Sequence, residues 1–175
     1  MRSLLAKDWR LEVNTAGIDA DCPVWVPVHG LTSFTETQDN NTEDDSDFDS
    51  GGWGSDVVTQ RKWSIEAEGK RKRKDKQRFE PDPGQEFIRR SARLIGFDAT
   101  IEVRWYRRDG SPDAHRGYCT VSEFEKGGEV TDLEPFTFTL AGQGEPVEII
   151  NPWDPPEPLP VPYDEAESDS GEVFG

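Results

Sequence analysis

The sequence is short of the residues that build disulfide frameworks, metal sites and catalytic dyads. Its 175 residues include two Cys, two His and one Met. Cys22 and Cys119 lie far apart and form no CxxC or CxxH pattern, so we expect two reduced thiols rather than a disulfide or a zinc site. His29 and His115 belong to no motif that would pair them with a nucleophile, so we expect surface or strand-end histidines. These absences argue against an enzyme and against a bound metal or cofactor.

Long apolar runs are also missing. Only 33% of the residues are hydrophobic, and no stretch approaches the roughly 18–20 apolar residues of a membrane span. Residues 1–9 contain no apolar core of a signal peptide, so we expect no secretion signal. Nine Phe, six Trp and three Tyr nevertheless argue against a fully disordered chain. We therefore expect one modest core, and no membrane insertion.

Lys and Arg are absent from two segments, and this explains most of the net charge of −16. Residues 36–56 and 152–175 hold fifteen of the 36 acidic residues, which leaves 21 acids against 20 bases elsewhere. Blocks of one charge usually remain solvated. We predict a long acidic loop over 36–56 and an acidic, Pro-rich tail over 153–175. Such a charge argues against general attraction to DNA phosphates or anionic lipids.

The acidic loop contains a partial calcium-loop pattern. Asp45, Asp47 and Asp49 occupy alternate positions, and Asp56 falls where the last ligand of a calcium loop would stand. However, Gly51 comes one position late, an Asp replaces the final Glu, and neither flank looks helical. A merely acidic loop is the better interpretation.

One basic run has the opposite character. Residues 70–78 hold seven bases and one acid. Two interpretations stay open: a solvated turn, or a patch that meets the acidic loop of another subunit, because opposite charges steer and align assembly.

Period-two alternation predicts several half-buried strands. The clearest cover 9–13, 63–67, 101–105 and 136–140; shorter candidates cover 23–28, 118–124 and 147–150, and strands over 30–35 and 57–69 would flank the acidic loop.

One helix is predicted over 82–95. Asp82 is an N-cap candidate, Pro83 suits the first helical position, and Gly96 is a stop signal. Phe87, Ile88, Ser91, Ala92 and Ile95 trace one face with helical spacing.

The order of several segments resembles the major tail tube proteins of long-tailed, non-contractile bacteriophages. The segments are WVPVHGL (25–31), WSIEAEG (63–69), PDPG (81–84), FTFTLAGQG (136–144) and NP (151–152). The resemblance covers most of residues 5–152, while the acidic tail leaves no room for the immunoglobulin-like domain of some relatives.

This resemblance implies a mainly β domain over 1–152, built as a β-sandwich or split barrel of two antiparallel sheets. It would carry one flanking helix, a long hairpin loop and extended termini, with 153–175 as an appendage. Six subunits would form a ring, and stacked rings would form the virion tail tube that conducts the genome without binding it specifically. Partners would be further copies and the tail tip or baseplate, tape-measure and tail terminator proteins, with synthesis in the bacterial host cytoplasm.

Two sets of site residues follow from this hypothesis. The subunit and ring interface would use Asp44, Asp45, Asp47, Asp49, Trp53, Arg71, Lys72, Arg73 and Lys74, and Glu66, Glu68 and Glu102 would face the lumen. The alternative is another virion binding module: a head–tail connector, a capsid decoration protein or a carbohydrate-binding β-sandwich.

Overall fold

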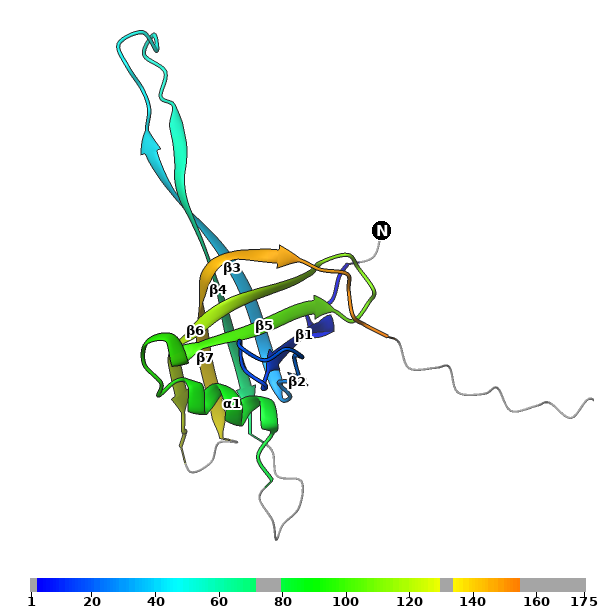
Figure 1. Ribbon diagram of the computed structural model, residues 1–175. Helices are drawn as coiled ribbons and strands as arrows, with labels where there is room; N and C mark the ends of the chain where they lie inside the picture. The colour runs from blue at the N-terminus through cyan, green and yellow to red at the C-terminus, as the bar shows by residue number, and fades with distance from the viewer. Residues whose placement is uncertain (1–2, 72–79, 130–133, 155–175) are drawn as a thin grey trace, which may run out of the picture.

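The computed structural model describes residues 3–71, 80–129 and 134–154, which form one antiparallel sheet with a single α-helix (Figure 1). The strands are β1 (Trp9–Asn14), β2 (Trp25–Pro27), β3 (Leu31–Asp44), β4 (Asp56–Lys70), β5 (Thr100–Arg107), β6 (Ala114–Lys126) and β7 (Pro135–Glu148). The helices are α1 (Pro83–Ser91) and the short 3-10 helices η1 (Ala6–Asp8) and η2 (Gly96–Ala99). None of the helices in these ranges has the length and apolar character needed to span a bilayer.

The sheet is continuous and strongly curved. Its strand order is β2-β1-β5-β6-β7-β4-β3, so β1 and β3 lie near opposite edges. Even so, Trp9 of β1 stacks on Phe34 of β3 with ring centroids 5.2 Å apart. The mainly β prediction is confirmed, but the expectation of two separate sheets is not. The long strands β6 and β7 stay paired through two register shifts, one with extra residues in β7 and one with an extra residue in β6, and such bulges bend a sheet without breaking it.

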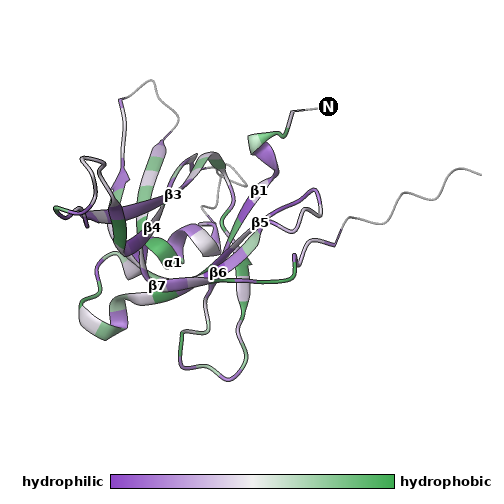
Figure 2. Ribbon diagram, turned by 90° about the horizontal axis from the view of Figure 1, so that it is seen from above, coloured by the Kyte–Doolittle hydropathy of each residue, from purple (hydrophilic) through white to green (hydrophobic). Residues whose placement is uncertain are grey.

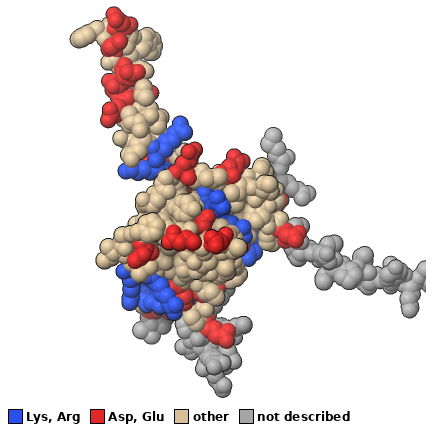
Figure 3. Space-filling model, in the orientation of Figure 1, with Lys and Arg blue, Asp and Glu red and all other residues tan. Residues whose placement is uncertain are grey.

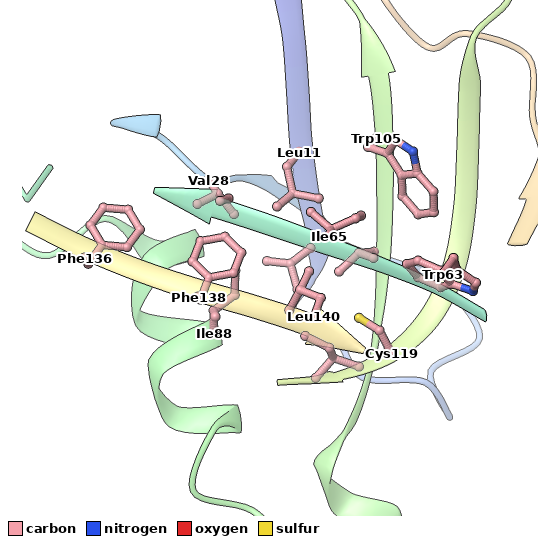
Figure 4. Close-up of a cluster of buried hydrophobic side chains, with 14 residues drawn as sticks. Leu11, Val28, Trp63, Ile65, Ile88, Trp105, Cys119, Phe136, Phe138 and Leu140 are labelled. Atoms are coloured by element: carbon pink, nitrogen blue, oxygen red, sulfur yellow. The ribbon is translucent and has the colours of Figure 1, made fainter. Parts of the chain in front are cut away.

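The apolar core lies inside this curve. It joins side chains of β1, β4, β5, β6 and β7 to Ile88 of α1 (Figure 4). Viewed from the hairpin end, α1 lies within the curve of the strands and closes the far end of the body (Figure 2). The predicted alternation is confirmed on β4, where Trp63, Ile65 and Ala67 are buried and the glutamates between and after them are exposed.

Helix α1 begins as predicted and ends earlier. Asp82 is the N-cap, and its Oδ2 accepts a hydrogen bond from the backbone N–H of Gln85 at 3.1 Å. The helix ends at Ser91, and Ile95 has an extended backbone. The prediction that Ile95 lies on the buried face was wrong, since this side chain is 89% exposed. After Ala92 the backbone N–H groups of Arg93 and Leu94 make only tighter turn bonds, so helical spacing no longer places Ile95 over the core.

The predicted loop over 36–56 is mostly a β-hairpin. Strand β3 continues to Asp44 and β4 begins at Asp56, so the connection is only 45–55 (Figure 1). Nearly every side chain between Glu36 and Lys62 is exposed, so polar side chains on both faces concealed the strands from a periodicity test. Cross-strand pairs such as Asp39 with Lys62 bring opposite charges together and support the register.

The remaining sequence predictions have mixed outcomes. Both cysteines are free, with Cys22 exposed and Cys119 buried. His29 is exposed, while His115 lies at the start of β6 and stacks on Trp105 at 5.7 Å. Most of the basic run 70–78, and the tail beyond 154, lie outside the described residues.

Candidate assembly interface

The tip of the β3–β4 hairpin, residues 45–55, is an ordered acidic turn. The Asp45 N–H donates to the Ser55 carbonyl at 2.7 Å and closes the base of the turn. Within it, Asp47 Oδ1 accepts from the Asp49 N–H at 3.0 Å and from the Ser50 hydroxyl at 2.9 Å. Such Asp-centred turns set the backbone locally, without help from a core.

Asp44 lies just before the tip, and Ser46 within the tip binds its carboxylate. The Ser46 N–H donates to Asp44 Oδ1 at 2.8 Å, and hydrogen bonding by the side chain and then the backbone of Ser46 lowers the pKa of Asp44. Asp44 therefore stays charged at neutral pH, at the free end of the hairpin.

The tip combines this charge with large exposed aromatic side chains. Phe48 is fully exposed and Trp53 is 82% exposed. Residues 43–56 contain six acids and no Lys or Arg, and Figure 3 shows acidic atoms along the projecting hairpin. The structure thus gathers Asp44, Asp45, Asp47, Asp49 and Trp53 of the predicted interface at one free end. Sequence reasoning overlooked Phe48, although an aromatic residue inside an acidic block was the available signal.

The basic members of the predicted interface are placed differently. Arg71 follows β4, at the end of the body away from the tip, and forms ion pairs with Glu86 of α1 at 3.4 Å and Glu134 at 3.3 Å. Its side chain is only 17% exposed, so it holds the helix to the strands within the subunit. Lys72, Arg73 and Lys74 lie outside the described residues.

Other arginines lie on α1 and just after it. Arg89 is held by Glu86, with Nη2 to Oε2 at 2.7 Å, and this hydrogen bond lowers the pKa of Glu86. Arg90 and Arg93 are exposed, and Arg90 lies 3.9 Å from the same carboxylate. In Figure 3, basic atoms gather over the helix end of the body. The end of the body opposite the tip therefore carries a group of exposed bases, whereas the tip carries none.

Two of the three predicted lumen residues lie on an exposed acidic face. Glu66 and Glu68 project from β4 on the side opposite the core. Register places Glu66 beside Thr139 and Glu68 beside Thr137 on β7. These threonines pair in turn with Glu123 and Glu125 of β6, giving two rows with a glutamate at β4 and at β6. We call these four glutamates the acidic face; Glu123 and Glu125 were missed because the bulge in β6 conceals their period.

Glu102 has different surroundings from the acidic face. It is 7% exposed, accepts a hydrogen bond from Asn14 Nδ2 at 3.0 Å and lies 3.3 Å from Arg116 Nε. Both of its neighbours come from adjacent strands, so the carboxylate links β1, β5 and β6 within one subunit.

A second buried carboxylate lies nearby. Glu12 is 5% exposed, pairs with Arg104 and accepts from the Tyr106 hydroxyl at 2.9 Å. Burial, and then the hydrogen bond to Glu12, raises the pKa of Tyr106 to about 12. This polar cluster stabilises the outer side of β1 and β5, and no sequence motif marks it.

These surfaces carry no cluster of metal ligands in the described part of the chain. No group of three or more His, Cys, Asp or Glu side chains there could hold a metal ion.

Comparison with known proteins identifies the fold. No protein-family model matches the chain, and no curated protein matches it either. Among solved structures, a chain of the virion of a native gene transfer agent particle is 18% identical, with a TM-score of 0.61, over 82% of this chain and 97% of that one. A chain from the tail of an empty gene transfer agent particle with C6 symmetry is 16% identical, with a TM-score of 0.60, over 84% and 99%. The SPP1 tail tube is 16% identical, with a TM-score of 0.61, over 85% and 81%. The chain has the fold of a tail tube subunit.

Proposed function

We propose that the chain is the structural subunit of a viral tail tube, assembled as stacked six-membered rings through which the genome passes. The observation that carries this proposal is the match of nearly the whole fold to the SPP1 tail tube and to a tail with C6 symmetry. Residues 1–152 form the assembling unit, and 153–175 form an appendage. The subunit works in the virion tail as a non-enzymatic component, after synthesis in the bacterial host cytoplasm.

The shape of the subunit supports assembly into a filament. Head-to-tail contacts between different surfaces generate rings and helical filaments, whereas twofold contacts close after two copies. The hairpin carries an acidic, aromatic tip far from the body, and basic residues lie at the opposite end (Figures 1 and 3). Such a molecule reaches a neighbour with one end and receives one at the other. The contacts would use the tip residues and the basic residues 72–74, while Arg71 stays paired within its own subunit.

The acidic face supports a role as the lining of the tube. Glu66, Glu68, Glu123 and Glu125 are exposed, with threonines of β7 between them. A lining of this charge repels phosphates and keeps DNA from adhering during passage. Glu102 contributes to the lining only if its pairing with Arg116 opens in the assembled ring.

The remaining partners follow from the ends of a tube. A tube of stacked rings needs a tip or baseplate protein at one end and a terminator at the other, and a tape-measure protein within it sets its length. None of these contacts requires membrane insertion or sequence-specific DNA binding.

Negative-stain electron microscopy of concentrated recombinant protein tests the proposal. We expect six-membered rings or hollow tubes of uniform bore. A strictly monomeric protein at high concentration, without rings or tubes, would refute it.

The lining has its own test in the same preparation. The double substitution Glu66→Lys and Glu68→Lys should leave tubes intact but make them retain DNA at low salt. The matched control is the pair Glu66→Gln and Glu68→Gln, which removes charge without reversing it. Equal DNA retention by wild type and the Lys variant would mean that the acidic face does not line the bore of the tube.

A further inference from the structure

The helix end of the body carries an apolar groove next to the exposed arginines. It has a volume of about 390 Å³ and lies between α1, η2 and the turn after β1, with Ile18, Phe87, Leu94 and Phe97 in its lining. Leu94 is 50% exposed and Phe97 is 70% exposed, and Ile95 beside them is 89% exposed. We call this the helix-end groove. Large apolar side chains that lie exposed together beside a groove are typical of contact surfaces.

The charges around the groove are mixed but leave exposed bases at its rim. Arg90 lines it, and the exposed Arg93 follows three residues later, beyond the end of α1. Asp19 and Asp98 also line it, on the side away from the helix. An occupant with aromatic side chains flanked by several acids would fill the apolar lining and meet Arg90 and Arg93.

The hairpin tip has this chemistry. Phe48 and Trp53 project from it without any covering side chain, between acids on both sides. It cannot reach the groove of its own subunit, because the tip and α1 lie at opposite ends of the molecule (Figure 1).

We propose that the helix-end groove receives the hairpin tip of a second copy of this chain. This inference rests on the proposed function and adds the receiving surface, which lies on α1 and η2. Trp53 and Phe48 insert beside Leu94 and Phe97, and the tip acids pair with Arg90 and Arg93. Because it joins two different surfaces, the same contact can repeat from one subunit to the next without closing.

The contact also accounts for the early end of α1. Once the helix ends at Ser91, Leu94, Ile95 and Phe97 face outward. Buried aromatic anchors dominate the energetics of protein contacts, and charge pairs around them set the approach and the register. The exposed residues after α1 supply an apolar surface for such anchors, through Leu94 and Phe97, and a positive charge for such pairs, through Arg93.

Disulfide trapping tests the contact directly. In a Cys22→Ser background, Asp49→Cys places a thiol on the tip and Asp98→Cys places one on the groove rim, while Cys119 stays buried. After mild oxidation of assembled protein, we expect a ladder of covalent multimers from the double variant. The control pairs Asp49→Cys with Glu125→Cys on the acidic face and should give no ladder.

Two outcomes separate this inference from the proposed function. Normal tubes without a ladder, or an equally strong ladder from the control, would overturn the groove contact and leave the tube function standing. Absence of any assembly in the Cys22→Ser parent would overturn the tube function, and the contact with it. Truncation after residue 154 should keep the ladder; a ladder that forms only after this truncation would assign the groove to the acidic tail instead.

A second measurement covers the aromatic side chains. Trp53→Ala should raise the critical concentration for tube growth at least tenfold, because truncated interface anchors commonly cost this much or more. Leu94→Ala with Phe97→Ala should have the same effect, whereas Val147→Ala, at another exposed apolar side chain, should change it less than twofold. An unchanged critical concentration in Trp53→Ala would contradict the proposal.

Discussion

Shortening the hairpin should abolish tube assembly while leaving the subunit folded. The change replaces residues 41–60 with Asn-Gly, which joins Asn40 to Arg61, two residues that are paired across the hairpin. Asn-Gly suits the two-residue turn that such a junction needs. Glu36 is retained because its carboxylate accepts a hydrogen bond from the Trp105 indole N–H at 2.8 Å.

The magnitude follows from burial. The segment removed contributes no side chain to the core cluster, and nearly all of it is exposed. Exposed changes away from special features usually stay within about 0.5 kcal/mol, and a shorter connection slightly lowers the entropy cost of closure. We therefore expect the free energy of unfolding to change by less than about 1 kcal/mol, and Tm by less than about 4 °C.

The assay combines thermal unfolding by circular dichroism with sedimentation and negative-stain microscopy. Wild type should pellet as tubes, and the shortened variant should stay in the supernatant with an unchanged melting curve. Gln60→Ala, in the arm of the same hairpin, is the matched control and should assemble normally. Normal tubes from the shortened variant, or a fall in Tm above about 10 °C, would refute the reasoning.

Three further predictions concern the subunit itself and are measured by chemical denaturation. Gly142→Ala should cost about 1–3 kcal/mol, because a Cβ there would collide with the buried Trp63 indole; Gly54→Ala, which meets open space, should be neutral. Asp82→Ala should cost about 1 kcal/mol through loss of the N-cap of α1, and Asp82→Asn should recover most of it. Glu86→Gln should destabilise at neutral pH, since the lowered pKa of Glu86 means that its carboxylate stabilises the folded state. That contribution is lost as pH falls through the folded-state pKa, so the two proteins should converge in stability once the pH is below that lowered pKa; a constant difference would contradict the assignment.

The features that the sequence predicted correctly are those with a local signal, such as a buried strand face or a helix cap. Alternation at Trp63, Ile65 and Ala67 located the core side of β4, and Asp82 with Pro83 located the start of α1. Both signals are local, since one reflects a buried face and the other a cap. The curvature of the sheet depends instead on contacts between distant strands, such as Trp9 with Phe34, which no local pattern contains.

Each feature that the sequence did not predict has its own physical cause. The outer part of the hairpin is polar on both faces, so hydrogen bonding rather than burial defines its strands. Ile95 was assigned to the core because an apolar residue at helical spacing usually lies there, yet the helix had already ended. The pairing of Glu102, which was predicted to face the lumen, could not be foreseen, because its partners Asn14 and Arg116 come from other strands.

An electron cryomicroscopy reconstruction of the assembled protein tests the account most directly. We predict a tube of stacked rings, six copies in each, with Glu66 and Glu68 on the bore and every hairpin tip in the helix-end groove of a subunit in the next ring. A protein that forms no rings or tubes would contradict the central claim.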